Sequence, residues 1–193
     1  MALSNKEVIL FYKLWLSLLQ FVNNHYHISD SLPKVLEQPV GLDVQAIARV
    51  ASYLFEHLNI VDEYLSENPD HFDDEKLEII RTWKYPVKGY FYVERILKKG
   101  AMLVSLDGEV YCVSSLVSSW EEMVRNQSLP VIIQTVLLPF KDQITYASVM
   151  QGEPVSCGGG IQSQLKEKYL KAKRAGQIID TAKRLIQSEK RKA

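Results

Sequence analysis

Cysteine is scarce in this sequence, and its scarcity excludes the folds that depend on it. Only Cys112 and Cys157 occur among 193 residues, which is too few for a disulfide framework and matches no zinc-binding spacing. A chain of this length buries about 70% of the surface that it exposes when unfolded, so it can fold without covalent or metal staples. So few cysteines are also typical of a reducing compartment, which predicts a cytoplasmic protein.

The chain as a whole has no net charge at neutral pH. Lys and Arg number 23, Asp and Glu also number 23, and apolar residues make up 47%, which excludes a disordered or collagen-like chain. The charges are nevertheless separated along the sequence. Residues 62–78 contain eight acidic residues and one basic residue, whereas residues 161–193 contain ten basic and three acidic residues. The two segments could both be solvated helix faces, or they could dock on each other. Alternatively, the basic segment could bind an anionic partner.

Apolar runs long enough to cross a membrane are absent. The longest candidate covers residues 8–22 and contains a lysine, whereas a spanning helix needs about 20 apolar residues. Ser4 and Glu7 stand before it with the spacing of a capping box, in which the two residues satisfy each other's backbone amides. The run therefore predicts a buried helix over 5–24 rather than a signal or membrane segment.

The first part of the chain, residues 1–86, is expected to be helical. Apolar residues recur at three- and four-residue spacing over 43–67 and over 73–84, and each segment begins with an aspartate that suits an N-cap. Pro86 ends the pattern, because proline disfavours a helical conformation in the residue before it. With the helix over 5–24, three helices are predicted.

The apolar spacing changes from 3.6 to 2 over residues 87–150, which predicts strands. Asp107-Gly108 between two apolar runs is the clearest turn signal, and a two-residue loop there would place Val104 opposite Tyr111. Four or five short antiparallel strands usually curl into a small barrel, since closure removes exposed edges. The other predicted elements are strands over 90–97, 131–138 and 144–149 and a short helix over 118–125.

The fold class that follows is α+β. Residues 151–193 are predicted to form a glycine loop and two basic helices, over 161–174 and 177–190. An N-terminal helical part, 1–86, would pack on a small antiparallel barrel or curled sheet, 87–150.

A basic and aromatic strand is the first candidate binding surface. The run from Lys88 to Arg95 partly resembles the RNA-binding strand of RRM domains, whose exposed rings stack on bases. Phe91 stands where that strand has a small residue, and the elements upstream are helical, so an aromatic core strand explains the run more simply. The candidate nucleic-acid contacts are Lys88, Tyr90, Tyr92 and Arg95.

The triplet Gly158-Gly159-Gly160 is the second candidate, because glycines before a helix can bind an anion through backbone amides. The lysine of a phosphate-binding loop does not follow it, so a flexible connection is the alternative. Cys157 precedes the glycines and could be a nucleophile. All four histidines lie in the first half of the chain, so an inert cysteine is the simpler interpretation.

The segment 136–146 carries a longer motif. Its sequence VLLPFKDQITY, followed by glycines and a basic helix, resembles the C-terminal half of an uncharacterised family of small bacterial proteins, with an L-L-P-[FY]-[KR] strand end and an I-x-Y segment. In similar chains Asp-Gly usually follows the tyrosine, where this sequence has Ala147-Ser148. The resemblance covers residues 88–175 and implies no activity that can be carried over.

Two residues of this motif, Lys141 and Tyr146, could form a polar pocket with Gly158, Gly159 and Gly160. No catalytic constellation, metal site or cofactor is expected. The sequence therefore favours a non-catalytic interaction or regulatory protein with a protein partner or self-association. Nucleic-acid binding through residues 84–99 and the basic C-terminal helices is the first alternative, and an enzyme centred on Cys157 is the second.

Overall fold

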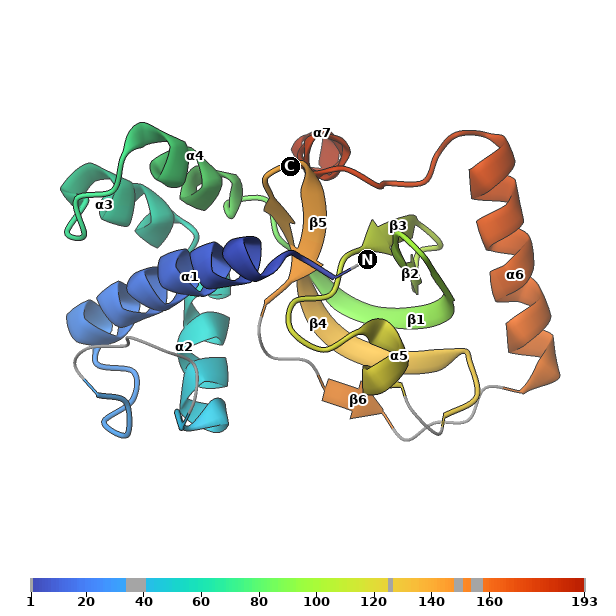
Figure 1. The fold of residues 1–193 in the computed structure, drawn as a ribbon, viewed down its shortest axis with the longest axis horizontal. Helices are drawn as coiled ribbons and strands as arrows, with labels where there is room; N and C mark the ends of the chain where they lie inside the picture. Colours follow the sequence, from blue (N-terminus) through green and yellow to red (C-terminus); the bar gives the residue numbers. More distant parts are fainter. Residues whose placement is uncertain (1, 34–40, 125–126, 148–150, 154–157, 193) are drawn as a thin grey trace. The chain divides into compact units, whose positions relative to one another are not determined.

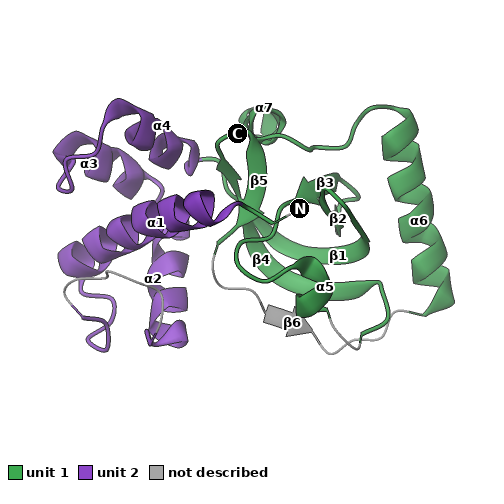
Figure 2. Cartoon of the chain, viewed as in Figure 1, with its two compact units in different colours: residues 1–3, 85–193 green, residues 4–84 purple. Residues whose placement is uncertain are grey.

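The chain is divided into two compact units in the computed structural model, which describes residues 2–33, 41–124, 127–147, 151–153 and 158–192 (Figure 1). Residues 4–84 form the helical unit, and residues 1–3 with 85–193 form the sheet unit (Figure 2). The helical unit has 7 basic and 13 acidic residues and the sheet unit has 16 and 10, so their net charges are −6 and +6. The neutrality of the chain is therefore the sum of two oppositely charged units.

The helical unit contains α1 (Asn5–Tyr26), α2 (Val44–Glu56), α3 (Asn59–Glu67) and α4 (Asp74–Thr82). The predicted capping box of Ser4 and Glu7 starts α1 and is confirmed. The prediction of one helix over 43–67 is wrong. His57 interrupts it with φ −130° and ψ 65°, and its ring nitrogen Nδ1 lies 2.9 Å from the carbonyl oxygen of Tyr53. Among the described residues, no helix combines the length and the apolar character that a membrane crossing requires.

Aromatic side chains fill the core of the helical unit. Trp15 stacks on Phe55, and its ring centroid lies 5.6 Å from that of Trp83 in an edge-to-face arrangement. Phe11 contacts both tryptophans. Aromatic pairs of this kind add about 0.5–1.5 kcal/mol beyond the burial of their area. This packing explains why α1 is apolar around most of its circumference.

The sheet unit is built on an antiparallel sheet with the strand order β3-β2-β1-β4-β5, and β6 pairs with β4. The first three strands follow one another as hairpins, and α5 (Trp120–Met123) leads to β4, which returns beside β1 as in a Greek key. The amide of Ser114, after β3, donates to the carbonyl of Ile144 in β5 at 2.8 Å, so the sheet curls into a half-barrel. The α+β class is confirmed. The strands are β1 (Val87–Leu97), β2 (Gly100–Ser105), β3 (Val110–Val113), β4 (Val131–Phe140), β5 (Gln143–Tyr146) and β6 (Gln151–Glu153).

Two C-terminal helices pack on this sheet, α6 (Gly159–Arg174) and α7 (Ala182–Lys192). Leu165 and Tyr169 of α6 are buried against the outer face of β2 and β3. Leu185 of α7 is fully buried, and the amide of Ala182 donates to the carbonyl of Asp142 at the β4–β5 turn. The glycines at 159 and 160, predicted as loop, belong to the first turn of α6.

The register of the β2–β3 hairpin differs from the prediction by one residue. Val104 lies opposite Val110 rather than opposite Tyr111. The amide of Ser105 donates to the carbonyl of Glu109 at 2.9 Å, which leaves a three-residue loop. Gly108 ends that loop with φ 91°, and a left-handed last residue is the usual feature of three-residue hairpin loops.

Candidate functional site

The residues of the predicted polar pocket are not brought together by the fold. Lys141 is exposed at the tip of the β4–β5 hairpin. Tyr146 lies at the other end of β5 and is buried, and its hydroxyl accepts from the amide of Leu116 and donates to the sulfur of Met123, both at 3.4 Å. Gly158, Gly159 and Gly160 are exposed at the start of α6. No contact joins these three places in the part of the chain that the structure describes.

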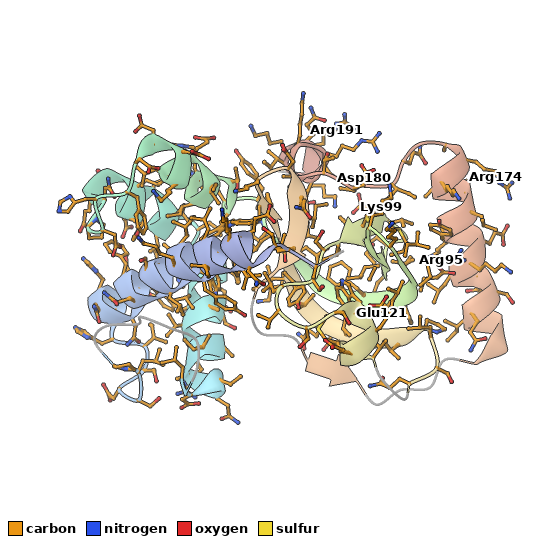
Figure 3. The ribbon with its side chains drawn as sticks, viewed as in Figure 1. Arg95, Lys99, Glu121, Arg174, Asp180 and Arg191 are labelled. Carbon is orange, nitrogen blue, oxygen red and sulfur yellow. The ribbon has the colours of Figure 1, made fainter. Side chains whose placement is uncertain are left out.

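The four predicted nucleic-acid contacts lie in two different environments. Tyr92 packs under α6. Arg95 lies beside α6 (Figure 3). Its guanidinium is 4.1 Å from the ring centroid of Tyr169 in that helix. Arg95 also pairs with Glu94, which raises the pKa of its guanidinium further. In contrast, Lys88 and Tyr90 are exposed at the beginning of β1. Of the four residues, only these two are exposed, and Tyr92 and Arg95 are partly buried.

The beginning of β1 has a neighbouring strand on one side only. β4 pairs with β1 over 87–93, whereas β2 pairs with it only from Phe91 onward. The reason is length, because β1 has 11 residues and β2 has 6. Residues 87–90 therefore form an open edge on the β2 side, with no described strand beside it.

The alternation of the β-ladder shows which backbone groups point to this open edge. Val136 lies opposite Lys88 on β4, and its carbonyl accepts from the amide of Ala147 on the far side of β4. In an antiparallel ladder, two directly opposite residues either bond each other or both point away, so Lys88 points away from β4. The amides of Lys88 and Tyr90 and the carbonyl of Lys88 consequently point to the open edge. Among the described residues, none of these three groups has a hydrogen-bond partner.

A cavity of about 340 Å³ lies beside this edge. Its walls are residues 87–91 of β1, the β2–β3 hairpin and the end of α7. Gly89 faces it without a side chain, and a Cβ added there would meet no atom within 4 Å. Two apolar side chains are exposed at its rim, Tyr90 at 41% and Leu106 at 60%. The site thus combines unpaired backbone groups, empty space and exposed apolar surface.

Glu109 fixes one wall of the cavity. Its carboxylate accepts from the hydroxyl of Tyr111 at 2.7 Å, from the Oγ of Ser188 at 3.3 Å and from the Nζ of Lys192 at 2.5 Å. Burial acts to raise the pKa of Glu109, but the hydrogen bonds from Lys192 and Tyr111 outweigh it and hold that pKa below its ordinary value. Burial and the same carboxylate raise the pKa of Tyr111. These groups keep one charge state near neutral pH and tie α7 to the hairpin.

Two charged residues of the cavity rim remain without an ion pair in the described structure, Lys88 and Asp107. Further unpaired cations lie on the outer faces of α6 and α7, where Arg174 and Arg191 are examples (Figure 3). The exposed cations of α6 are Lys166, Lys168, Lys171, Lys173 and Arg174.

The ionisable side chains that line the cavity are Lys88, Asp107, Glu109, Tyr111, Glu189 and Lys192. The described residues contain no cluster of three or more His, Cys, Asp or Glu side chains able to hold a metal ion. Cys112 is buried beneath α6, and burial raises the pKa of its thiol. Cys157 lies outside the described residues, so its proposed role as a nucleophile stays a prediction.

Comparison of the chain with models of known protein families, with curated proteins and with solved structures finds no match. The resemblance of residues 88–175 to a bacterial family therefore stays a prediction. The sequence predicts Lys88 and Tyr90 as contacts through their side chains and does not indicate the open edge formed by their backbone. The missing signal was the extent of β1, whose first three residues precede the predicted strand at 90–97.

Proposed function

We propose that the protein is a non-catalytic interaction protein that binds a protein partner at the open edge of β1. The observation that carries this proposal is the cavity beside residues 87–90, where unpaired backbone groups lie next to the exposed Tyr90 and Leu106. Proteins normally cover, shorten or charge a strand edge, because it can pair with any other strand. Here a single lysine, Lys88, discourages unspecific pairing and leaves the edge accessible.

The chemistry of the cavity supports binding rather than catalysis. Its buried polar groups are already paired with one another, as in the contacts of Glu109 with Tyr111 and Lys192. A general base or nucleophile needs an accessible group whose pKa lies near the working pH, and the shifts of Glu109 and Tyr111 point away from neutrality. Because these polar groups are hydrogen-bonded to one another, the wall of the cavity that they form keeps a constant shape and charge.

Filling the cavity is expected to weaken peptide binding without unfolding the protein. Gly89→Leu introduces a side chain where no atom lies within 4 Å, and leucine suits a strand better than glycine does. We expect a phage library of random short peptides to yield clones that bind the wild-type chain, and we expect these clones to bind Gly89→Leu at least about tenfold more weakly. Gly158→Leu, at an exposed glycine far from β1 in the sequence, is the matched control. Failure to enrich any clone, or equal binding to Gly89→Leu, would contradict the proposal.

Nucleic-acid binding is a second candidate, supported by the strand connectivity and the charge of the sheet unit. The five-stranded Greek-key arrangement resembles that of OB-folds, which bind oligonucleotides on strands 2 and 3 and on the loops 1–2 and 4–5. Here α6 covers the face of β2 and β3 with apolar contacts. The two loops remain exposed and carry Lys98, Lys99 and Lys141.

The salt dependence of oligonucleotide binding tests this second candidate. If a labelled oligothymidylate binds through phosphate contacts, its affinity falls steeply with salt, with a log–log slope of about −0.7 per contact. Replacing Lys98, Lys99 and Lys141 by alanine should then make the slope shallower by about 2. Replacing Lys166, Lys171 and Lys173 of α6 is a control of equal charge. Binding that is absent at low salt, or unaffected by the loop substitutions, would exclude nucleic-acid binding at these loops.

A further inference from the structure

We infer that the partner contributes an extended peptide, which adds as a strand to the open edge of β1, antiparallel to β1 and in line with β2. This inference rests on the proposed function and specifies how the partner is bound and what its sequence contains. In such strand addition, main-chain hydrogen bonds supply affinity, and the pockets for alternate side chains supply specificity.

The position of the added strand follows from the register of β1 and β2. Ser105, the last residue of β2, lies opposite Phe91, and the chain then turns away into the hairpin loop. Leu106 follows Ser105 and therefore lies beside Tyr90. A peptide in line with β2 places two successive residues beyond Leu106, opposite Gly89 and then Lys88. Its backbone then pairs with the amide and the carbonyl of Lys88, which have no partner among the described residues.

Side-chain chemistry at the edge defines the preferred sequence of the peptide. The residue that precedes the two paired ones lies near the exposed Tyr90 and Leu106, which favours an apolar side chain. The first paired residue lies opposite Gly89 and points into the cavity, where an aromatic ring can cover the glycine. The second paired residue lies opposite Lys88, whose amine has no ion pair in the described structure, and an acidic side chain would neutralise it. The motif is therefore apolar, aromatic, acidic from the N-terminal to the C-terminal end.

The size of the site favours a single peptide strand over a second copy of the chain. The β2–β3 hairpin and the end of α7, with Glu189 and Lys192, stand on the open side of β1 and limit the cavity to about 340 Å³. This volume accommodates a few side chains and falls in the range of small ligand pockets. A second copy would have to bring its whole sheet into the same space.

The substitution Lys88→Pro tests strand addition directly. Because the amide of Lys88 points to the open edge, Lys88→Pro removes a donor that serves the peptide and breaks no hydrogen bond within the described sheet. Lys88→Ala is the matched control, since it removes the same charge and keeps the amide. With peptides enriched on the wild-type chain as the probe, we expect binding to Lys88→Pro to be at least about tenfold weaker than binding to Lys88→Ala. Thermal unfolding of both variants verifies that each remains folded.

Methylation of the peptide backbone provides an independent readout. A methyl group on the amide of the acidic residue blocks its bond to the carbonyl of Lys88, whereas a methyl group on the aromatic residue's amide points away from β1. We expect the first to abolish binding and the second to preserve it. Equal binding to Lys88→Pro and Lys88→Ala, or tolerance of both methyl groups, would overturn strand addition and leave the proposed function standing if Gly89→Leu still blocks the same peptides. An absence of enriched peptides would instead contradict the proposed function.

Discussion

Replacement of Gly100 by alanine is expected to lower the free energy of unfolding of the sheet unit by about 2–5 kcal/mol. Gly100 begins β2 with φ 146°, a conformation that residues with a Cβ rarely adopt. A Cβ at this position would lie 2.6 Å from the carbonyl oxygen of Val113. The same oxygen accepts the indole N–H of Trp120 at 2.8 Å. The substitution therefore displaces backbone in the β2–β3 pairing and disturbs a buried hydrogen bond.

Fluorotryptophan NMR during urea unfolding measures this effect in each unit separately. Trp120 is the one tryptophan of the sheet unit, and Trp15 and Trp83 belong to the helical unit. We expect the Trp120 signal of Gly100→Ala to change at a lower urea concentration. Gly89→Ala is the control, because its Cβ meets nothing within 4 Å, and it should leave stability within about 1 kcal/mol of the wild type. Equal stability of the two variants would contradict the close approach at Gly100.

Much of the architecture could be predicted because it depends on local signals. The capping box of Ser4 and Glu7 begins α1 as predicted, and the change of apolar spacing near Pro86 lies close to the boundary between the two units at residue 84. Each of these signals depends on a few residues that are close together in the sequence. The break at His57 was not predictable, because leucine and valine continue the helical pattern on both sides of it.

Positions that depend on distant parts of the chain were harder to predict. The β2–β3 register shifted by one residue because Gly108 ends a three-residue loop, and an Asp-Gly pair suits a loop of either length. The sequence motif predicts Tyr146 as a pocket residue, whereas its hydroxyl bonds the amide of Leu116 and the sulfur of Met123 inside the sheet unit. The open edge depends on where β2 ends relative to β1. This relative position cannot be predicted from the sequence of either strand alone.

Amide hydrogen exchange along β1 is expected to alternate from residue to residue. The amides of Gly89 and Phe91 point to β4 and lie within its ladder, whereas those of Lys88 and Tyr90 point to the open edge. Protected amides in a sheet exchange only after local or global opening, and an opening free energy of about 5 kcal/mol slows exchange by more than about a thousandfold. Unpaired amides on an accessible edge exchange at nearly the rate of an unfolded peptide.

The exchange rates of these four amides in the free protein, resolved by NMR, are the most direct test of the open edge on which the proposed binding depends. We expect slow exchange at Gly89 and Phe91 and fast exchange at Lys88 and Tyr90 in the free protein, with the amide of Lys88 becoming slow when a selected peptide binds. Uniformly slow exchange over residues 88–91 in the free protein would contradict this expectation, because it would mean that the edge is already paired.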